Sequence, residues 1–263
     1  MRRIMVEKRG IQSIEVGGAL LRALVDHGGP MLLGDLAKKA GMPSAKAHPY
    51  LVSYCNLGLV SQDPTSGRYE LGPFALQMGL ISLQRMDPVR VAIPLVDAIG
   101  PTVGHTVALA TPGSYGPTIV HIRPAIDPIH VAMRTGTVMS LLQTATGLAF
   151  AAYLPPMTVR ALVEIETKVA RQAGTVHAKF EQSELDALLG EIREHGLART
   201  LDAPIQGISA MSAPVFDYTG QIVLAVTAIG PTGSFDSAWN GRLATALRDC
   251  AAAISAKLGF QIP

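Results

Sequence analysis

Glycine and proline divide the first sixty residues into three helical segments. Apolar residues recur at helical spacing over 14–27, 33–40 and 44–57, and each segment stops at or just before a glycine. Ser13 stands where an N-cap of the first helix is expected, and Gly28-Gly29-Pro30 ends that helix. A helix, a short helix, a glycine-containing turn and a third helix in this order predict a helix-turn-helix motif.

Two short extended runs follow the third helix. Residues 59–62 and 68–71 flank a five-residue turn over 63–67 that has proline early and glycine late, which predicts a hairpin. A helix-turn-helix followed by a hairpin is a winged helix. Residues 73–86 are predicted to be helical, and Asp87-Pro88 ends that helix. We therefore divide the chain into a winged-helix domain (1–72), a linker helix (73–87) and a C-terminal domain (88–263).

Beyond residue 88, predicted helices frame predicted strands. A long strand pair, 208–217 and 221–230, is the clearest hairpin of the chain. This order favours an α+β domain, with one antiparallel sheet and helices on its faces. The other predicted strands are 105–111, 118–123 and 129–133, and the predicted helices are 88–103, 146–154, 157–166, 183–195 and 237–258.

Composition excludes several classes of protein. Only 16% of the residues are charged and the mean hydropathy is +0.30, so an intrinsically disordered chain is excluded. Charges, prolines or glycines interrupt every apolar run before about 18 residues, so no spanning helix is expected. So few charges indicate that part of the apolar surface is covered by self-association or lines a ligand cavity. Two distant cysteines without metal-ligand spacing suit a reducing cytoplasm, which is the expected location.

The charge is divided unevenly along the chain. Residues 1–90 carry a formal charge of +4 and residues 91–263 carry −2. In the third helix, Ala47, Leu51 and Tyr54 fall on one side together with Tyr50 and should be buried. The opposite side is small and polar, carries Lys46 and has no carboxylate, so it can approach phosphates. These features indicate DNA binding, although a three-helix bundle with a solvated third helix would share them.

Motifs along the chain carry a resemblance to one protein family. They are Gly41-Met-Pro-Ser-Ala-Lys-Ala-His-Pro-Tyr-Leu51, Gly58-Leu-Val60, Gly67-Arg-Tyr-Glu-Leu-Gly72, Thr144-Ala-Thr-Gly147, Glu191-Ile-Arg-Glu-His-Gly-Leu197, Gly207-Ile-Ser-Ala-Met-Ser-Ala-Pro-Val-Phe-Asp217, Gly220 and Gly230-Pro231. Together they resemble the IclR-type bacterial transcriptional regulators, from about Ser13 to Gly259.

The resemblance implies a DNA-binding winged helix, a linker helix and a GAF-like effector domain. It further implies a homodimer or homotetramer, double-stranded operator DNA as one partner, and a small organic or aromatic acid as effector. We predict a regulator of a catabolic operon, with no catalytic activity, cofactor, metal or membrane association. The predicted DNA contacts are Arg3, Ser44, Ala45, Lys46, His48, Tyr50, Ser53 and Arg68.

The resemblance also places an effector pocket near the Thr144–Gly147 motif and the last two strands. Ser212 is expected to flank the effector-binding residues. Thr146 is open to a second interpretation, as the cap of its own helix. The predicted effector-binding residues are Met133, Met139, Leu142, Thr146, Gly147, Ser209, Ala210, Met211, Thr227 and Ile229.

The sequence departs from the family pattern at three places. Pro49 stands where the family commonly has arginine, which removes a cation and a backbone donor from the third helix and is expected to bend it or shift its start. Leu148 replaces a lysine, and of an expected acidic pair before Gly207 only Asp202 is kept. These changes predict a less polar pocket and an effector such as an aromatic acid.

Two other classes of function stay open from the sequence. His105, His121 and His130 fall on successive predicted strands, and would form a metal or acid–base site if their side chains faced one way. The winged helix could instead contact protein, because Pro49 alters the usual DNA surface.

Overall fold

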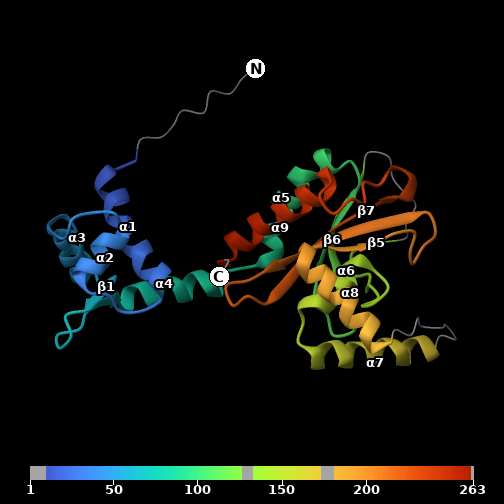
Figure 1. Cartoon of the computed structure of the whole chain (residues 1–263), viewed down its shortest axis with the longest axis horizontal. Coiled ribbons are helices and arrows are strands. Elements are labelled where there is room, and N and C mark those ends of the chain that lie inside the picture. The colour runs from blue at the N-terminus through green and yellow to red at the C-terminus, as the bar shows by residue number, and fades with distance from the viewer. Residues whose placement is uncertain (1–9, 126–132, 173–180, 262–263) are drawn as a thin grey trace, which may run out of the picture. The chain divides into compact units, whose positions relative to one another are not determined.

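The computed structural model describes residues 10–125, 133–172 and 181–261 (Figure 1). It separates into two compact units, Met1–Met86 and Asp87–Pro263. None of the helices within the described ranges is long and apolar enough to cross a membrane.

The first unit is a winged helix. Its helices are α1 (Gln12–His27), α2 (Leu33–Lys39) and α3 (Ser44–Asn56), followed by the antiparallel pair β1 (Val60–Gln62) and β2 (Tyr69–Leu71) and by α4 (Pro73–Gln84). The core is formed by side chains from all three N-terminal helices and the hairpin: Leu20, Leu24, Leu36, Ala47, Leu51, Val60 and Tyr69.

One detail of the first helix differs from the prediction. Ser13 lies inside α1, which starts at Gln12 after Ile11, and no side chain caps it. At the other end, Gly28 adopts φ +72° and its N–H bonds to the Leu24 carbonyl, as expected for a glycine that terminates a helix.

The second unit is built on an antiparallel sheet. In the described residues the strand order is β4 (Thr118–Arg123), β3 (Thr106–Thr111), β7 (Ile222–Pro231), β6 (Ile208–Phe216) and β5 (Ala198–Thr200). Its helices are α5 (Pro88–Val103), α6 (Ala145–Tyr153), α7 (Pro156–Gln172), α8 (Gln182–His195) and α9 (Arg242–Lys257). The α+β prediction and its antiparallel sheet are confirmed.

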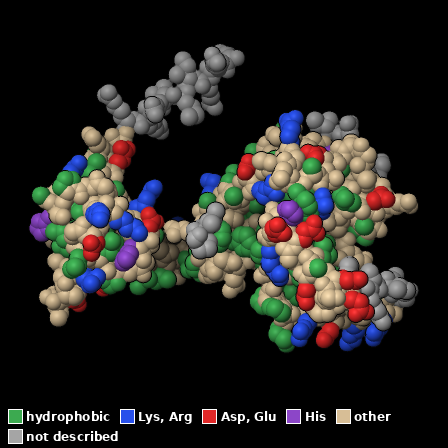
Figure 2. All heavy atoms as spheres, viewed as in Figure 1, with side chains coloured by type: hydrophobic (Ala, Val, Ile, Leu, Met, Phe, Trp, Pro, Cys, Tyr) green, Lys and Arg blue, Asp and Glu red, His purple; other side chains and the backbone are tan. Residues whose placement is uncertain are grey.

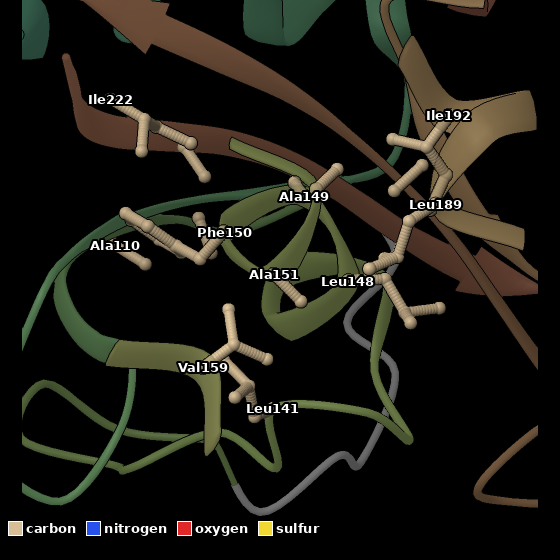
Figure 3. Packing of buried hydrophobic residues seen from close by; sticks show 14 of the residues in the cluster. Ala110, Leu141, Leu148, Ala149, Phe150, Ala151, Val159, Leu189, Ile192 and Ile222 are labelled. Atoms are coloured by element: carbon tan, nitrogen blue, oxygen red, sulfur yellow. The ribbon is translucent and has the colours of Figure 1, made fainter. Parts of the chain in front are cut away.

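The sheet has a layer of helices on each face. Helices α5 and α9 cover one face, whereas α6 and α8 lie on the other (Figure 1). In Figure 3, Leu148 of α6 points toward Leu189 and Ile192 of α8, and the three side chains belong to one buried cluster. Residues alternate between the two faces along each strand, so their position in β6 or β7 decides which layer they meet.

Start signals explain where α5 and α6 begin. The Asp87 carboxylate accepts hydrogen bonds from the Val89 and Arg90 amides, at 3.0 and 3.2 Å, and Pro88 occupies the first turn. For α6 the cap is Thr144, whose hydroxyl accepts from the Gly147 amide at 3.0 Å. Thr146 is therefore not the cap of its own helix.

The last helix starts later than predicted, at Arg242 rather than Ser237. The Asp236 carboxylate accepts from the Ala238 amide, which holds a turn. Trp239 then stacks on His195 with 4.2 Å between ring centroids, and the Arg199 guanidinium lies 3.9 Å from the centre of a Trp239 ring. These contacts hold the segment as a loop against α8 and β5.

Other differences are smaller. Strand β5 was not predicted because three residues give too short a pattern, and α7 extends to Gln172 rather than 166. Of the strand predicted over 129–133, residues 129–132 lie outside the described residues. The contacts of α4 group it with the first unit, and its separate role as a linker over 73–87 stays a prediction.

We predict that Gly147→Ala will destabilise the second unit. A Cβ at Gly147 would overlap the backbone carbonyls of Ser140 and Leu141, which cannot rotate away as a side chain would. Overpacking of this kind costs about 1–3 kcal/mol of unfolding free energy. Urea unfolding measures the change.

Gly190→Ala is the matched control. Gly190 is an exposed glycine within α8, and its Cβ would meet nothing within 4 Å. It should gain about 0.5–1 kcal/mol from the higher helix propensity of alanine. A Gly147→Ala protein as stable as the wild type would contradict the close approach of α6 to the preceding loop.

Candidate DNA and effector sites

Helix α3 packs in the first unit by the side that the sequence predicted. Ala47 and Leu51 are fully buried, whereas Tyr50 and Tyr54 are half-buried. Both tyrosine side chains occupy the space where a Cβ on Gly17 of α1 would lie. Glycine at this position therefore lets the two helices approach closely, and Tyr50 lies on the packing side rather than at the centre of the outer side.

The outer side of α3 is exposed. Ser44, Ala45, Lys46, His48 and Ser53 all face solvent, as do Pro49, Val52 and Asn56. No side chain caps the N-terminus of the helix and its first turn contains no acidic residue. Free first-turn amides and the positive end of the helix dipole favour an anion there, so this surface suits a phosphate backbone.

Pro49 neither ends nor delays the helix. The α-helix runs from Ser44 through Pro49 to Asn56, with its start where the sequence placed it. Because proline has no N–H, the Ala45 carbonyl loses its usual helical donor. The Ser53 hydroxyl donates to the Pro49 carbonyl at 3.0 Å, and so turns back toward the backbone.

The wing is a rigid turn. The Asp63 carboxylate accepts from the amides of Thr65 and Ser66 and from the Ser66 hydroxyl, and these bonds hold the pKa of this exposed carboxyl below its usual value. Gly67 adopts φ +68°, which favours glycine. Arg68 is exposed, and its Nη1 donates to the Pro30 carbonyl at 3.3 Å, so the wing is tied to the turn after α1. Arg3 lies outside the described residues.

A chain of three buried hydroxyl groups joins α6 to the sheet. Thr146 Oγ1 and Thr227 Oγ1 are 2.8 Å apart, and Thr227 Oγ1 donates to Ser212 Oγ at 2.9 Å. All three side chains are at most 1% exposed, and Thr227 lies opposite Ser212 in the β6–β7 ladder. Because Thr227 gives its one proton to Ser212, Thr146 must donate to Thr227, and the Ser212 O–H is the one that is not donated within the chain.

Apolar residues lie on the same face of the sheet as this hydroxyl chain. Met133, Met139, Leu142 and Ala210 are partly buried and pack against the same cluster as buried Ile229. Ala210 lies opposite Ile229 in the ladder, one step along the α6 face from the Ser212–Thr227 pair. Of the ten predicted effector residues, the structure joins Thr146 to Thr227, with Gly147 next to Thr146. The Ala210–Ile229 pair lies beside Thr227 in the ladder, and Met133, Met139 and Leu142 pack against the cluster that contains Ile229.

Two predicted effector residues are not part of this group. Ser209 and Met211 alternate with Ala210 along β6, so their side chains face the α5–α9 side of the sheet. Ser209 bonds to the Asp202 amide and the Thr232 hydroxyl. Ser212, which the sequence placed only as a flanking residue, faces α6 instead. The strict two-residue period would have identified it.

The described histidines do not form the metal or acid–base site that the sequence left open. His105 stacks on Phe235 and burial lowers its pKa, whereas His121 pairs with Asp97 at 2.9 Å. Among the described residues no three His, Cys, Asp or Glu side chains are placed to hold a metal. His130 lies outside the described residues. Burial raises the pKa of Cys250 to about 11, so its thiol stays protonated at neutral pH.

A separate hollow lies at the edge of the sheet. Its volume is about 370 Å³, and Tyr153, Phe216 and Phe260 line it together with the C-terminal half of α9. Its lining includes none of the predicted effector residues. The hydroxyl chain and this hollow are therefore different places on the second unit.

Comparison with known families identifies the chain. The IclR helix-turn-helix domain matches residues 13–64, and the bacterial transcriptional regulator IclR C-terminal domain matches residues 81–256. The chain belongs to the IclR family. It is a DNA-binding transcriptional regulator, as predicted, and the enzyme alternative is not supported.

Relatives match over nearly the whole length. The glycerol operon regulatory protein of Streptomyces griseus is 32% identical over 255 residues, which cover 95% of this chain and 98% of the relative. The DNA-binding transcriptional repressor YiaJ of Escherichia coli is 25% identical, over 96% and 90% of the two chains. The crystal structure of Pseudomonas aeruginosa HmgR superposes with a TM-score of 0.87 at 33% identity, over 96% of this chain and 100% of that chain.

We predict that Thr227→Val will destabilise the protein although it keeps the side-chain shape. The change leaves the Thr146 and Ser212 hydroxyls buried without their partner, which costs about 1–3 kcal/mol of unfolding free energy. Urea unfolding measures it. Because apolar replacement of all partners can be nearly neutral, adding Thr146→Val and Ser212→Ala should recover part of the loss.

Thr111→Val in β3 serves as the control, because the Thr111 hydroxyl is not part of the hydroxyl chain. If Thr227→Val were no less stable than Thr111→Val, the hydroxyl chain would carry no stabilisation.

Proposed function

We propose that this regulator binds operator DNA through the outer side of α3 and the wing, under the control of a small effector held on the α6 face of the sheet. The proposed DNA contacts in the described residues are Ser44, Ala45, Lys46, His48, Ser53 and Arg68. Access to chromosomal DNA requires a cytoplasmic location, and the relatives named for operons support a role in regulating a catabolic operon.

The hydroxyl chain carries the effector proposal. Ligand pockets are mainly apolar with a few convergent polar groups. Here the hydroxyl chain lies beside Ala210 and Ile229 on one face of the sheet, and Met133, Met139 and Leu142 pack against the cluster that contains Ile229. The amides of Ala145 and Thr146 lie in the first turn of α6, where the helix dipole favours negative charge. A carboxylate suits these donors, and an apolar body suits the remaining walls.

The apolar character of the site favours an aromatic acid over a small hydrophilic one. Leu148, which stands where the resemblance expects a lysine, is buried toward α8, so it brings no charge to this layer. A short acid such as glyoxylate has no apolar surface to pack against the partly buried Met133 and Met139. An aromatic ring would remove more apolar area from water and so bind more tightly.

Self-association is proposed through α4. This helix contains no charged residue and none of its residues is buried. Figure 2 shows hydrophobic side chains on the surface along it. A helix that is apolar on all sides is normally buried, and a second copy of the chain offers a matching helix across a two-fold axis. Its exposed large side chains are Phe74, Leu76, Met78, Leu80, Ile81 and Leu83.

We predict that benzoate or phenylacetate will raise the thermal unfolding midpoint more than glyoxylate or pyruvate at equal concentration. A ligand that binds only the folded state stabilises it by mass action. Differential scanning fluorimetry measures the shift, and Ser212→Ala, which removes the O–H left to donate, should abolish it. Ser209→Ala is the matched control, since Ser209 faces the other side of the sheet, and it should keep the shift. Stabilisation by the two- and three-carbon acids alone would refute the aromatic effector.

We predict that Leu76→Glu combined with Ile81→Glu will reduce the oligomer to a monomer. The two side chains are 64% and 56% exposed, so the single chain loses little packing when they change. Sedimentation velocity measures the mass, with Met157→Glu on α7 as a control that is 72% exposed and should keep the wild-type mass. A wild-type monomer, or a double variant that still associates, would contradict the α4 interface.

A further inference from the structure

The outermost line of α3 is apolar. Ala45, Pro49 and Val52 are separated by four and three residues, so they lie on one line of the helix surface. This line is opposite buried Ala47 and Leu51, and therefore projects farthest from the unit. We call these three residues the α3 ridge.

The α3 ridge has no packing role in its own unit. All three residues are exposed, Val52 to 45%, and none belongs to the core cluster of the winged helix or packs against it. Polar side chains stand beside the ridge, with Lys46 on one flank and His48 on the other. A helix that only meets solvent has no need of three apolar side chains at the centre of its exposed side.

We propose that the α3 ridge reads thymine methyl groups in the major groove of the operator. The C5-methyl of thymine is the apolar group that a base pair presents in this groove, and apolar side chains contact it. The inference deepens the proposed DNA contact by naming the base feature that α3 recognises. Pro49 removes the cation that the family commonly has at this position, and the proposal assigns it a role as an apolar contact surface.

The polar groups beside the ridge differ from it in the part of the DNA that they can contact. Ser53 donates its hydroxyl proton to the Pro49 carbonyl, so that proton is not offered to a base. Lys46 lies in the first turn, where the free amides favour a phosphate, and phosphate contacts carry no direct sequence information. Neither of these two groups therefore distinguishes bases through a donated hydrogen bond, and we assign discrimination at thymine to the ridge and affinity to Lys46 and the helix end.

The test uses an operator duplex recovered by selection from random-sequence DNA with the full-length protein. Each thymine of that duplex is replaced by deoxyuridine, which removes the methyl group and keeps base pairing. Removing one buried methyl should weaken binding about fourfold. The wild type should lose this factor at one to three positions of each half-site, measured by fluorescence anisotropy at fixed salt.

Variants assign the effect to the ridge. At the thymine that Val52 contacts, Val52→Ser should bind the thymine and deoxyuridine duplexes equally well, while Ala45 and Pro49 keep the discrimination at any other position. Val25→Ser, an equally exposed valine on α1 (47% against 45%), should keep the full discrimination. Lys46→Ala should weaken binding to both duplexes by the same factor and keep the discrimination, because it removes a phosphate contact.

The outcomes distinguish failure of methyl reading from failure of DNA binding through α3. A wild type that binds both duplexes equally, or a Val52→Ser protein that still discriminates at every position where the wild type does, overturns methyl reading while leaving DNA binding through α3 in place. Failure of the random pool to yield any operator, with Lys46→Ala no weaker than wild type on that pool, would overturn the α3 contact itself and favour a protein partner.

Discussion

Burial of α6 on every side is the constraint on which the second unit depends. Residues 145–152 are all buried, so the helix has no face left for water. Each of its polar groups must then find a partner inside the protein. Thr144 caps the N-terminus, Gly147 lets the preceding loop approach the helix, and Thr146 bonds into the sheet through Thr227. The polar groups of the proposed effector site are thus the ones that make burial of this helix possible.

This double use of the same groups gives a physical route for coupling. An acid that takes the spare O–H of the hydroxyl chain acts on groups that already join α6 to β6 and β7. Effector binding at the proposed site would then act on how the helix is held against the sheet. A coupling of this kind is reciprocal, so DNA that favours one arrangement must also change effector affinity.

The sequence predicted most of the fold because its signals were local. Glycine and proline punctuation placed α1, α2 and α3, and Asp87-Pro88 placed the start of α5. The errors arose where a distant contact decides. Trp239 leaves the helical pattern because it stacks on His195, and β5 exists because Ala198 to Thr200 pair with β6. In the effector region, the family resemblance selected β6 and β7, and the alternation along β6 turns Ser209 and Met211 to the face opposite Ala210 and Ser212. Pro49 shows the opposite case, since a residue expected to disturb α3 is accommodated in a continuous helix.

The stack of His195, Trp239 and Arg199 has a practical consequence. The chain has one tryptophan, so all of its indole fluorescence arises from the loop between β7 and α9. The ring lies against the C-terminal end of α8, and α8 packs on α6. Tryptophan emission from the native, unlabelled protein therefore reports on the second unit alone. Titrations with DNA and with small acids can each be followed at the same chromophore, and any DNA-induced change in its spectrum marks a signal that has travelled between the two units.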